Sequence, residues 1–310
     1  MNVDELYSSI KLKSSNSAQI HVHQWIPENC VGVIQVSHGL AEHGKRYSVL
    51  AAEFAKQGWA VIANDHQGHG LSMSANDSLG HVDHKDIWNL LIEDLGLVNK
   101  HIRESHPNKP LLLFGHSMGA ILSLSAVQRG LKCEGLVLSA LAPDQPALVG
   151  FGKGLASLQK SIFGAQKSAN LLVFASFGVY NMQFKPNRTK FDWLSRNNAE
   201  VDKYVNDPMC GNPPSVGYFK ALFDGLTSLY ERKNLFAIDS KLPVLMYAGA
   251  EDPVVGKEKE FFKTLETMRL HLPAIEWKIY PDGRHEMHNE KNREEVLNDL
   301  SSWIKDHFSA

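Results

Sequence analysis

A serine flanked by two glycines is the residue of this sequence best suited to covalent chemistry. Residues 115–119 read GHSMG, which matches the pattern G-x-S-x-G. The motif lies directly between the apolar runs 111–114 and 120–124, and strand, sharp turn and helix are the context in which it presents a serine hydroxyl above a sheet. Because such a hydroxyl is a weak nucleophile until a base takes its proton, Ser117 requires a histidine and an acid elsewhere in the chain.

Two later loops supply candidates for the acid and the base. Asp252 follows the apolar run 244–247, and His285 follows the run 275–280. Both therefore fall where strands of a parallel sheet end and ligands bind, in the order serine, acid, histidine that accompanies this serine motif. We predict that Ser117, His285 and Asp252 form a catalytic triad.

Neighbouring residues leave alternatives open for both partners. Glu251 and Asp282 are alternative acids, although the proline after Asp252 fixes the loop and favours Asp252. His288 is the alternative base, and we expect it instead at a helix start or on the surface. His285 and His288 form an H-x-x-H pair, but a zinc site needs further ligands and none is indicated, so we predict no metal.

The loop after the strand at 31–36 is suited to bind a developing negative charge. It reads SHGLAEHG over residues 37–44. Acyl transfer needs N–H donors aimed at the oxyanion, and we predict the backbone N–H groups of Leu40 and Met118. We expect His38 to be a structural histidine bonded to nearby backbone. Glu42 and Arg46, four residues apart, are predicted to form a surface or half-buried ion pair without a role in the chemistry.

These residues must be positioned by alternating strands and helices. An edge hairpin is predicted before residue 26, followed by apolar strands at 31–36, 59–63, 111–114, 136–139, 243–247 and 275–280. Helical patterns separate them at 47–54, 86–104, 118–128 and 258–268, with a last helix at 293–307. This rhythm implies a parallel sheet. It stops between about 145 and 238, where helical patches predominate. We therefore predict a core over 1–143 and 239–310, with a helical cap over 144–238.

Composition excludes several other classes of protein. The chain has 310 residues, 43% of them hydrophobic, and a formal net charge of -2, so it lacks the basic footprint of a nucleic-acid binder. We find no secretory signal and no apolar stretch long enough to span a bilayer. The three cysteines (Cys30, Cys133 and Cys210) show no metal-type spacing. We therefore expect reduced thiols and a cytoplasmic location.

Several motifs in order resemble the monoacylglycerol lipase and lysophospholipase group of α/β-hydrolases, often catalogued with serine aminopeptidases. They are HGLAEH with RY (38–47), DHQGHG (65–70), GHSMG (115–119), GAED (249–252) and GRH (283–285). The turn RHEM (284–287) is closer to bacterial members. The resemblance implies the α/β-hydrolase fold, a mostly parallel central sheet with helices on both faces and a helical lid. It also implies ester hydrolysis through an acyl-serine without a cofactor.

The cap is rich in apolar residues between 151 and 180. We predict that Leu171, Phe174, Phe177 and Tyr180 bind an acyl chain, and that the cap touches membrane surfaces transiently. Monoacylglycerols or lysophospholipids are the expected substrates, with a short-chain carboxylesterase as an alternative. An aminopeptidase for short peptides is another, because Glu200, Asp202 and Asp207 could hold a free amino group. A binding protein that keeps the fold without turnover is the alternative outside enzymes. Oligomeric state is not indicated.

Overall fold

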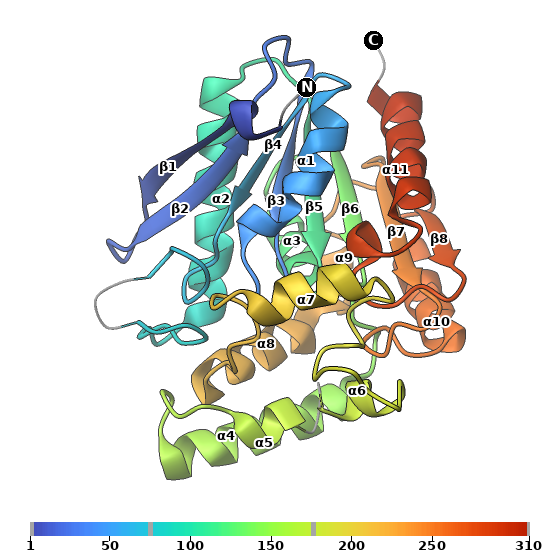
Figure 1. The fold of residues 1–310 in the computed structure, drawn as a ribbon. Coiled ribbons are helices and arrows are strands. Elements are labelled where there is room, and N and C mark those ends of the chain that lie inside the picture. The colour runs from blue at the N-terminus through green and yellow to red at the C-terminus, as the bar shows by residue number, and fades with distance from the viewer. Residues whose placement is uncertain (1–2, 74–76, 175–177, 309–310) are drawn as a thin grey trace.

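The computed structural model describes residues 3–73, 77–174 and 178–308, and an eight-stranded sheet forms its centre (Figure 1). The strand order is β1-β2-β4-β3-β5-β6-β7-β8. β1 pairs antiparallel with β2, β2 pairs antiparallel with β4, and all later neighbours are parallel. The strands are β1 (Tyr7–Lys13), β2 (Gln19–Trp25), β3 (Gly32–Ser37), β4 (Trp59–Asn64), β5 (Leu111–His116), β6 (Gly135–Ser139), β7 (Val244–Gly249) and β8 (Glu276–Tyr280). The predicted parallel sheet with an edge hairpin is confirmed.

The inner strands are buried on both faces because helices cover each side. Every residue of β3 to β7 is buried, which explains why these strands read as continuous apolar runs. α1 (Ser48–Ala55) and α11 (Arg293–Phe308) pack on one face of the sheet. α2 (Ile87–Ser105), α3 (Met118–Gln128) and α10 (Glu258–Arg269) pack on the other. Short 3₁₀ turns lie at Val3–Leu6, Gly44–Tyr47 and Met287–Asn289.

The segment between β6 and β7 is helical and lies across one end of the sheet (Figure 1). It contains α4 (Pro146–Phe163), α5 (Asn170–Val173), α6 (Val179–Met182), α7 (Asn198–Asn206), α8 (Val216–Leu229) and α9 (Arg232–Leu235). α4 packs on α8 around a small apolar cluster that includes Ala156 and Phe219. Sheet strands stop at Ser139 and resume at Val244; the domain limits 143/144 and 238/239 stay predictions. Within the described residues, no helix is both long and apolar enough to cross a bilayer.

Candidate active site

Ser117 occupies the sharp corner between β5 and α3. Its backbone φ is 54° and ψ is -118°, a conformation that costs energy for a residue with a side chain. The flanking glycines allow the corner to close. A Cβ on Gly119 would lie 1.9 Å from the Ser37 carbonyl oxygen, and one on Gly115 would lie 2.5 Å from the carbonyl oxygen of Gly119. The strained turn therefore depends on glycine at both positions.

His285 is bound to Asp252 in the interior of the protein. Its Nδ1 lies 2.9 Å from Oδ2 and 3.0 Å from Oδ1 of Asp252. Both residues are buried. Burial opposes the charged imidazolium, but the Asp252 carboxylate and its hydrogen bond outweigh that effect and raise the pKa of His285. The carboxylate accepts from Nδ1–H, which leaves Nε2 unprotonated in the neutral ring and able to act as a base.

Two aromatic rings also hold the imidazole of His285. The ring centroid of His116 lies 4.8 Å from that of His285, and the ring of Trp193 lies 4.9 Å from it. The backbone N–H of His285 donates to the carbonyl of Trp193 at 3.4 Å. His285 is therefore positioned by the core on one side and by the cap segment on the other.

The alternative acids and the alternative base occupy different environments. Glu251 is exposed, and Asp282, 81% exposed at its side chain, lies 3.7 Å from Arg196. His288 lies in the 3₁₀ turn 287–289, as expected of a residue at a helix start, but it is buried rather than at the surface. Its ring stacks on Tyr47 at 4.9 Å, and burial lowers its pKa to about 4. The geometry thus favours Asp252 and His285 for the triad.

Ser117 and His285 line one cavity together with the predicted oxyanion donors, Leu40 and Met118. Met118 is the first residue of α3, so its N–H belongs to the set that has no acceptor within the helix. The preceding loop N–H, that of Gly39, donates to Glu42 Oε1 at 2.6 Å. Leu40 is consequently the amide of this loop that we retain as the second donor.

The cavity wall is mainly apolar, and both the core and the cap contribute to it. Helix α8 contributes four side chains at helical spacing: Phe219, Leu222, Phe223 and Leu226. They follow the 3.6-residue period of one helix face, and this pattern was visible in the sequence, although we had not singled it out. A cavity with this lining and a few polar groups is typical of a site for an apolar ligand.

The cap residues predicted to bind an acyl chain are not all placed together. Tyr180 lines the cavity. Leu171 and Phe174 are 58% and 66% exposed, and Phe174 borders a different groove, which Ala41 and Phe191 also line. Phe177 lies outside the described residues. Only Tyr180 of the described three therefore faces Ser117.

The loop at 65–70 forms a compact turn beside the loop at 37–44. The latter carries the predicted oxyanion donor Leu40 and is called the oxyanion loop below. The carboxylate of Asp65 accepts from the N–H groups of Gly44 and Leu71, both at 2.8 Å. The ring of His38 bridges the loops, with Nδ1 2.7 Å from the Gly39 carbonyl and Nε2 accepting from His66 N–H at 2.9 Å. His38 is thus a structural histidine, as predicted.

Two clusters in the described structure carry metal-ligating residue types. His23, His43 and Asp65 converge in one, and His43, Asp207 and Cys210 in the other. Ordinary hydrogen bonds account for their approach. His23 Nε2 lies 3.2 Å from Asp65, and His43 Nε2 lies 2.9 Å from Asp207. We therefore assign neither cluster to a metal.

Comparisons with known proteins identify relatives of this chain. The family model described as "Serine aminopeptidase, S33" matches residues 28–292. A monoacylglycerol lipase from Mycolicibacterium smegmatis is 30% identical over 92% of both chains, and a monoglyceride lipase from Mus musculus is 27% identical over 96% of this chain and 91% of its own. A carboxyl esterase from Bacillus coagulans superposes with a TM-score of 0.88 at 23% identity, covering 97% of this chain and 99% of that one.

Proposed function

The chain belongs to the serine aminopeptidase S33 family and is a carboxylic ester hydrolase, and we propose that it cleaves monoacylglycerols or lysophospholipids through an acyl-enzyme on Ser117. One observation carries the proposal. A serine at a strained strand-to-helix corner and a histidine bonded to a buried carboxylate line the same, mainly apolar cavity.

The reaction follows from the roles of these groups. His285 Nε2 takes the proton of the Ser117 hydroxyl as Oγ attacks the ester carbonyl carbon. The N–H groups of Leu40 and Met118 donate to the oxyanion of the tetrahedral intermediate. When the intermediate collapses, the alcohol leaves with the proton from His285. Water, deprotonated by the same nitrogen, then cleaves the acyl-serine and releases the acid. Asp252 holds the Nδ1–H and stabilises the imidazolium throughout.

The acyl chain is proposed to lie along α8, because that helix contributes four apolar side chains to the cavity that Ser117 also lines. A short-chain ester would leave much of the α8 surface unused. The lining therefore favours a lipid-like ester over a short-chain one.

The aminopeptidase alternative is weakened by the carboxylates of the cap. Glu200 binds Lys203 at 2.9 Å and Arg293 at 3.1 Å. Asp202 pairs with Arg188, and Asp207 pairs with His43. None of the three is among the described residues that line the cavity. The groups that would hold a peptide's amino terminus are thus engaged elsewhere.

Contact with a membrane surface is proposed for the outer face of the cap. α4 packs inward through Gly152 and Ala156 and exposes apolar side chains on its other face. Among the described residues from α4 to the end of α6, the exposed large apolar ones are Leu148, Phe151, Leu158, Ile162, Phe163, Leu171, Phe174, Val179 and Met182. An exposed apolar patch of this kind is typical of an interaction surface. Sedimentation with phosphatidylcholine vesicles, with Phe151→Ser and Leu158→Ser as variants, tests the contact.

One assay panel tests the function. Hydrolysis of a monoacylglycerol, a lysophospholipid, p-nitrophenyl butyrate and proline-naphthylamide should be compared at equal concentration. We expect the long-chain esters to be preferred. Cleavage of the amide alone would contradict the proposal, and preference for the butyrate would favour the short-chain carboxylesterase. Failure of a fluorophosphonate to label folded protein would favour a binding protein.

A further inference from the structure

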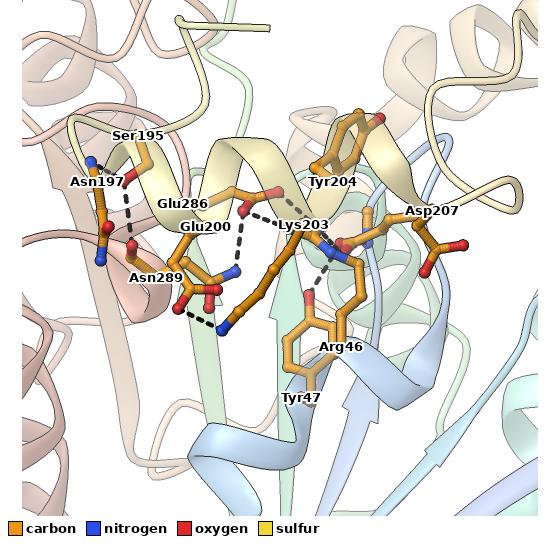
Figure 2. Close-up of polar contacts among 12 residues, drawn as sticks. Arg46, Tyr47, Ser195, Asn197, Glu200, Lys203, Tyr204, Asp207, Glu286 and Asn289 are labelled. Atoms are coloured by element: carbon orange, nitrogen blue, oxygen red, sulfur yellow. Dashed lines mark hydrogen bonds and ion pairs between the residues drawn. The ribbon is translucent and has the colours of Figure 1, made fainter.

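A single buried arginine joins the two loops that carry the predicted oxyanion donor and the catalytic histidine. Arg46 donates from Nη1 and Nη2 to the two carboxylate oxygens of Glu286, each at 2.7 Å (Figure 2). Nη1 donates to Glu42 as well. The side chains of Arg46, Glu42 and Glu286 are 10%, 3% and 4% exposed. The pair expected at the surface or half-buried is therefore part of a buried three-charge cluster. A bidentate arginine–carboxylate contact fixes direction as well as distance.

Glu42 connects the cluster to the backbone of the oxyanion loop, of which it is itself a residue. Glu42 Oε1 accepts from the N–H of Gly39 at 2.6 Å and from the hydroxyl of Tyr47 at 3.0 Å. Gly39 precedes Leu40, and a Cβ at Gly39 would lie 3.4 Å from the Cβ of Ser117. The position of the Glu42 carboxylate consequently sets where the Leu40 amide stands relative to the nucleophile.

The Glu286 arm reaches the catalytic histidine. Glu286 is the next residue after His285, and its N–H donates to the Leu194 carbonyl at 2.8 Å. Its carboxylate also accepts from the side-chain amide of Asn289 at 2.9 Å (Figure 2). Burial opposes its charge, but Arg46 outweighs that effect and lowers the pKa of Glu286 to about 2. Glu286 is thus an ionised anchor that fixes the backbone beside His285.

The cap helix α7 covers the arginine from the remaining side. The ring of Tyr204 lies 4.8 Å from the guanidinium carbon of Arg46. Its hydroxyl donates to the carbonyl of Ala41 at 2.8 Å. The cluster is therefore enclosed by the oxyanion loop, the histidine loop and the cap together.

We propose that Arg46 is a positioning residue, which through Glu42 and Glu286 keeps the Leu40 amide and His285 in register with Ser117. This inference rests on the proposed function. It differs from a general stabilising role because the two carboxylates belong to the two loops whose relative placement decides the rate. Misplacement of reacting groups by about 1 Å can cost on the order of 100-fold in rate.

The test uses kcat per titrated active site, so that misfolded protein does not count. Fluorophosphonate gives the number of active sites, and p-nitrophenyl butyrate gives kcat and KM. We expect Arg46→Lys and Glu286→Gln each to lower kcat by about 10-fold to 100-fold. KM should change by less than about twofold, because the apolar wall is untouched. Since both act through one contact, the double variant should be no slower than the slower single variant.

Arg293→Lys is the matched control. It makes the same chemical change in another ion pair between the cap and the C-terminal part of the chain, that of Arg293 with Glu200, at 3.1 Å. Within the described structure, neither Arg293 nor Glu200 bonds to Arg46, Glu42 or Glu286. The kcat of Arg293→Lys should therefore stay within about twofold of wild type, as usual for a partly exposed pair.

Two results would overturn the inference. One is an Arg46→Lys kcat equal to that of Arg293→Lys. The other is a loss of active Arg46→Lys sites with unchanged kcat per remaining site, which would mark a purely structural role. Failure of the proposed function is distinguishable, because wild-type protein would then turn over none of the esters, and the inference would fall with it.

Discussion

Replacing Asp252 by asparagine is the most informative single change in the candidate triad. In the structure, Asp252 Oδ1 accepts from the N–H of Val254 at 2.9 Å. An asparagine keeps this bond only if its side-chain oxygen takes the Oδ1 position. Its NH₂ group then takes the position of Oδ2, which is 2.9 Å from His285 Nδ1. Two donors would meet there unless the imidazole moves its proton to Nε2.

That tautomer cannot accept the serine proton, so the rate should fall steeply. The same substitution in the trypsin triad lowers kcat about 10⁴-fold, which corresponds to about 5.4 kcal/mol of transition-state stabilisation. Turning the asparagine over would restore the correct tautomer but would set its NH₂ against the N–H of Val254. Leaving that buried N–H without an acceptor costs about 1–3 kcal/mol, so the active tautomer is a minority of between about one in five and one in 160. This minority also lacks the carboxylate that stabilises the imidazolium. We therefore expect a loss of about 10³-fold to 10⁴-fold.

The assay is steady-state hydrolysis of p-nitrophenyl butyrate, with protein folding checked by thermal unfolding. Glu251→Gln is the matched control, because it neutralises the neighbouring exposed carboxylate. It should retain activity within about twofold, as expected for a surface charge. If Asp252→Asn keeps more than a tenth of the wild-type rate while Glu251→Gln loses most of it, the reasoning about the acid is wrong.

Further changes test the nucleophile, the base, the acyl site and the buried charge. Ser117→Ala should abolish turnover and fluorophosphonate labelling without lowering the unfolding temperature; labelling at another residue would contradict the assignment. Because Asp252 raises the pKa of His285, kcat/KM should rise with pH through a midpoint above the ordinary value of 6.5, and a midpoint below it would contradict that coupling. Leu222→Trp should fill the cavity and lower the rate for long-chain esters at least about tenfold relative to p-nitrophenyl butyrate; equal losses for both would remove α8 from the acyl site. Burial raises the pKa of Asp94 to about 6. The free energy of unfolding of the protein therefore falls as the pH rises from about 4 to 6. Between pH 4 and pH 8, the stability of Asp94→Asn relative to wild type should therefore rise by on the order of 2 kcal/mol, as measured by urea unfolding. The loss of a hydrogen bond from Ser14 or Gln67 shifts both values equally and leaves this difference unchanged.

The core of the fold could be predicted because each strand had a short-range signature. Strands buried on both faces, such as Val33–Val36 and Leu111–Phe114, are almost wholly apolar, and the helices between them carry a distinct period. The corner at Ser117 was also visible, since glycine at 115 and 119 is needed where backbone atoms approach within van der Waals distance. These requirements are local, so they can be recognised in short stretches of consecutive residues.

The cap could be predicted only as a helical insertion. Its apolar residues are of the same types whether they face solvent, the core or the cavity. The density of apolar residues along the chain therefore pointed to 171–180 rather than to α8. The structure instead places Leu171 and Phe174 at the surface and four residues of α8 beside Ser117. The apolar face of α8 is visible in its 3.6-residue period, but what the helix packs against decides whether that face lines a cavity.

The residue types and their order along the chain were enough to name a nucleophile, a base and an acid, because a parallel sheet brings the ends of its strands together whatever the loops contain. Tertiary structure alone decided the environment of charged side chains far apart in sequence. Arg46 and Glu286 are separated by 240 positions. The predicted ion pair between Glu42 and Arg46 is therefore part of a buried cluster that connects two loops. Burial and charge pairing depend on the whole packed chain, whereas motifs depend only on neighbours.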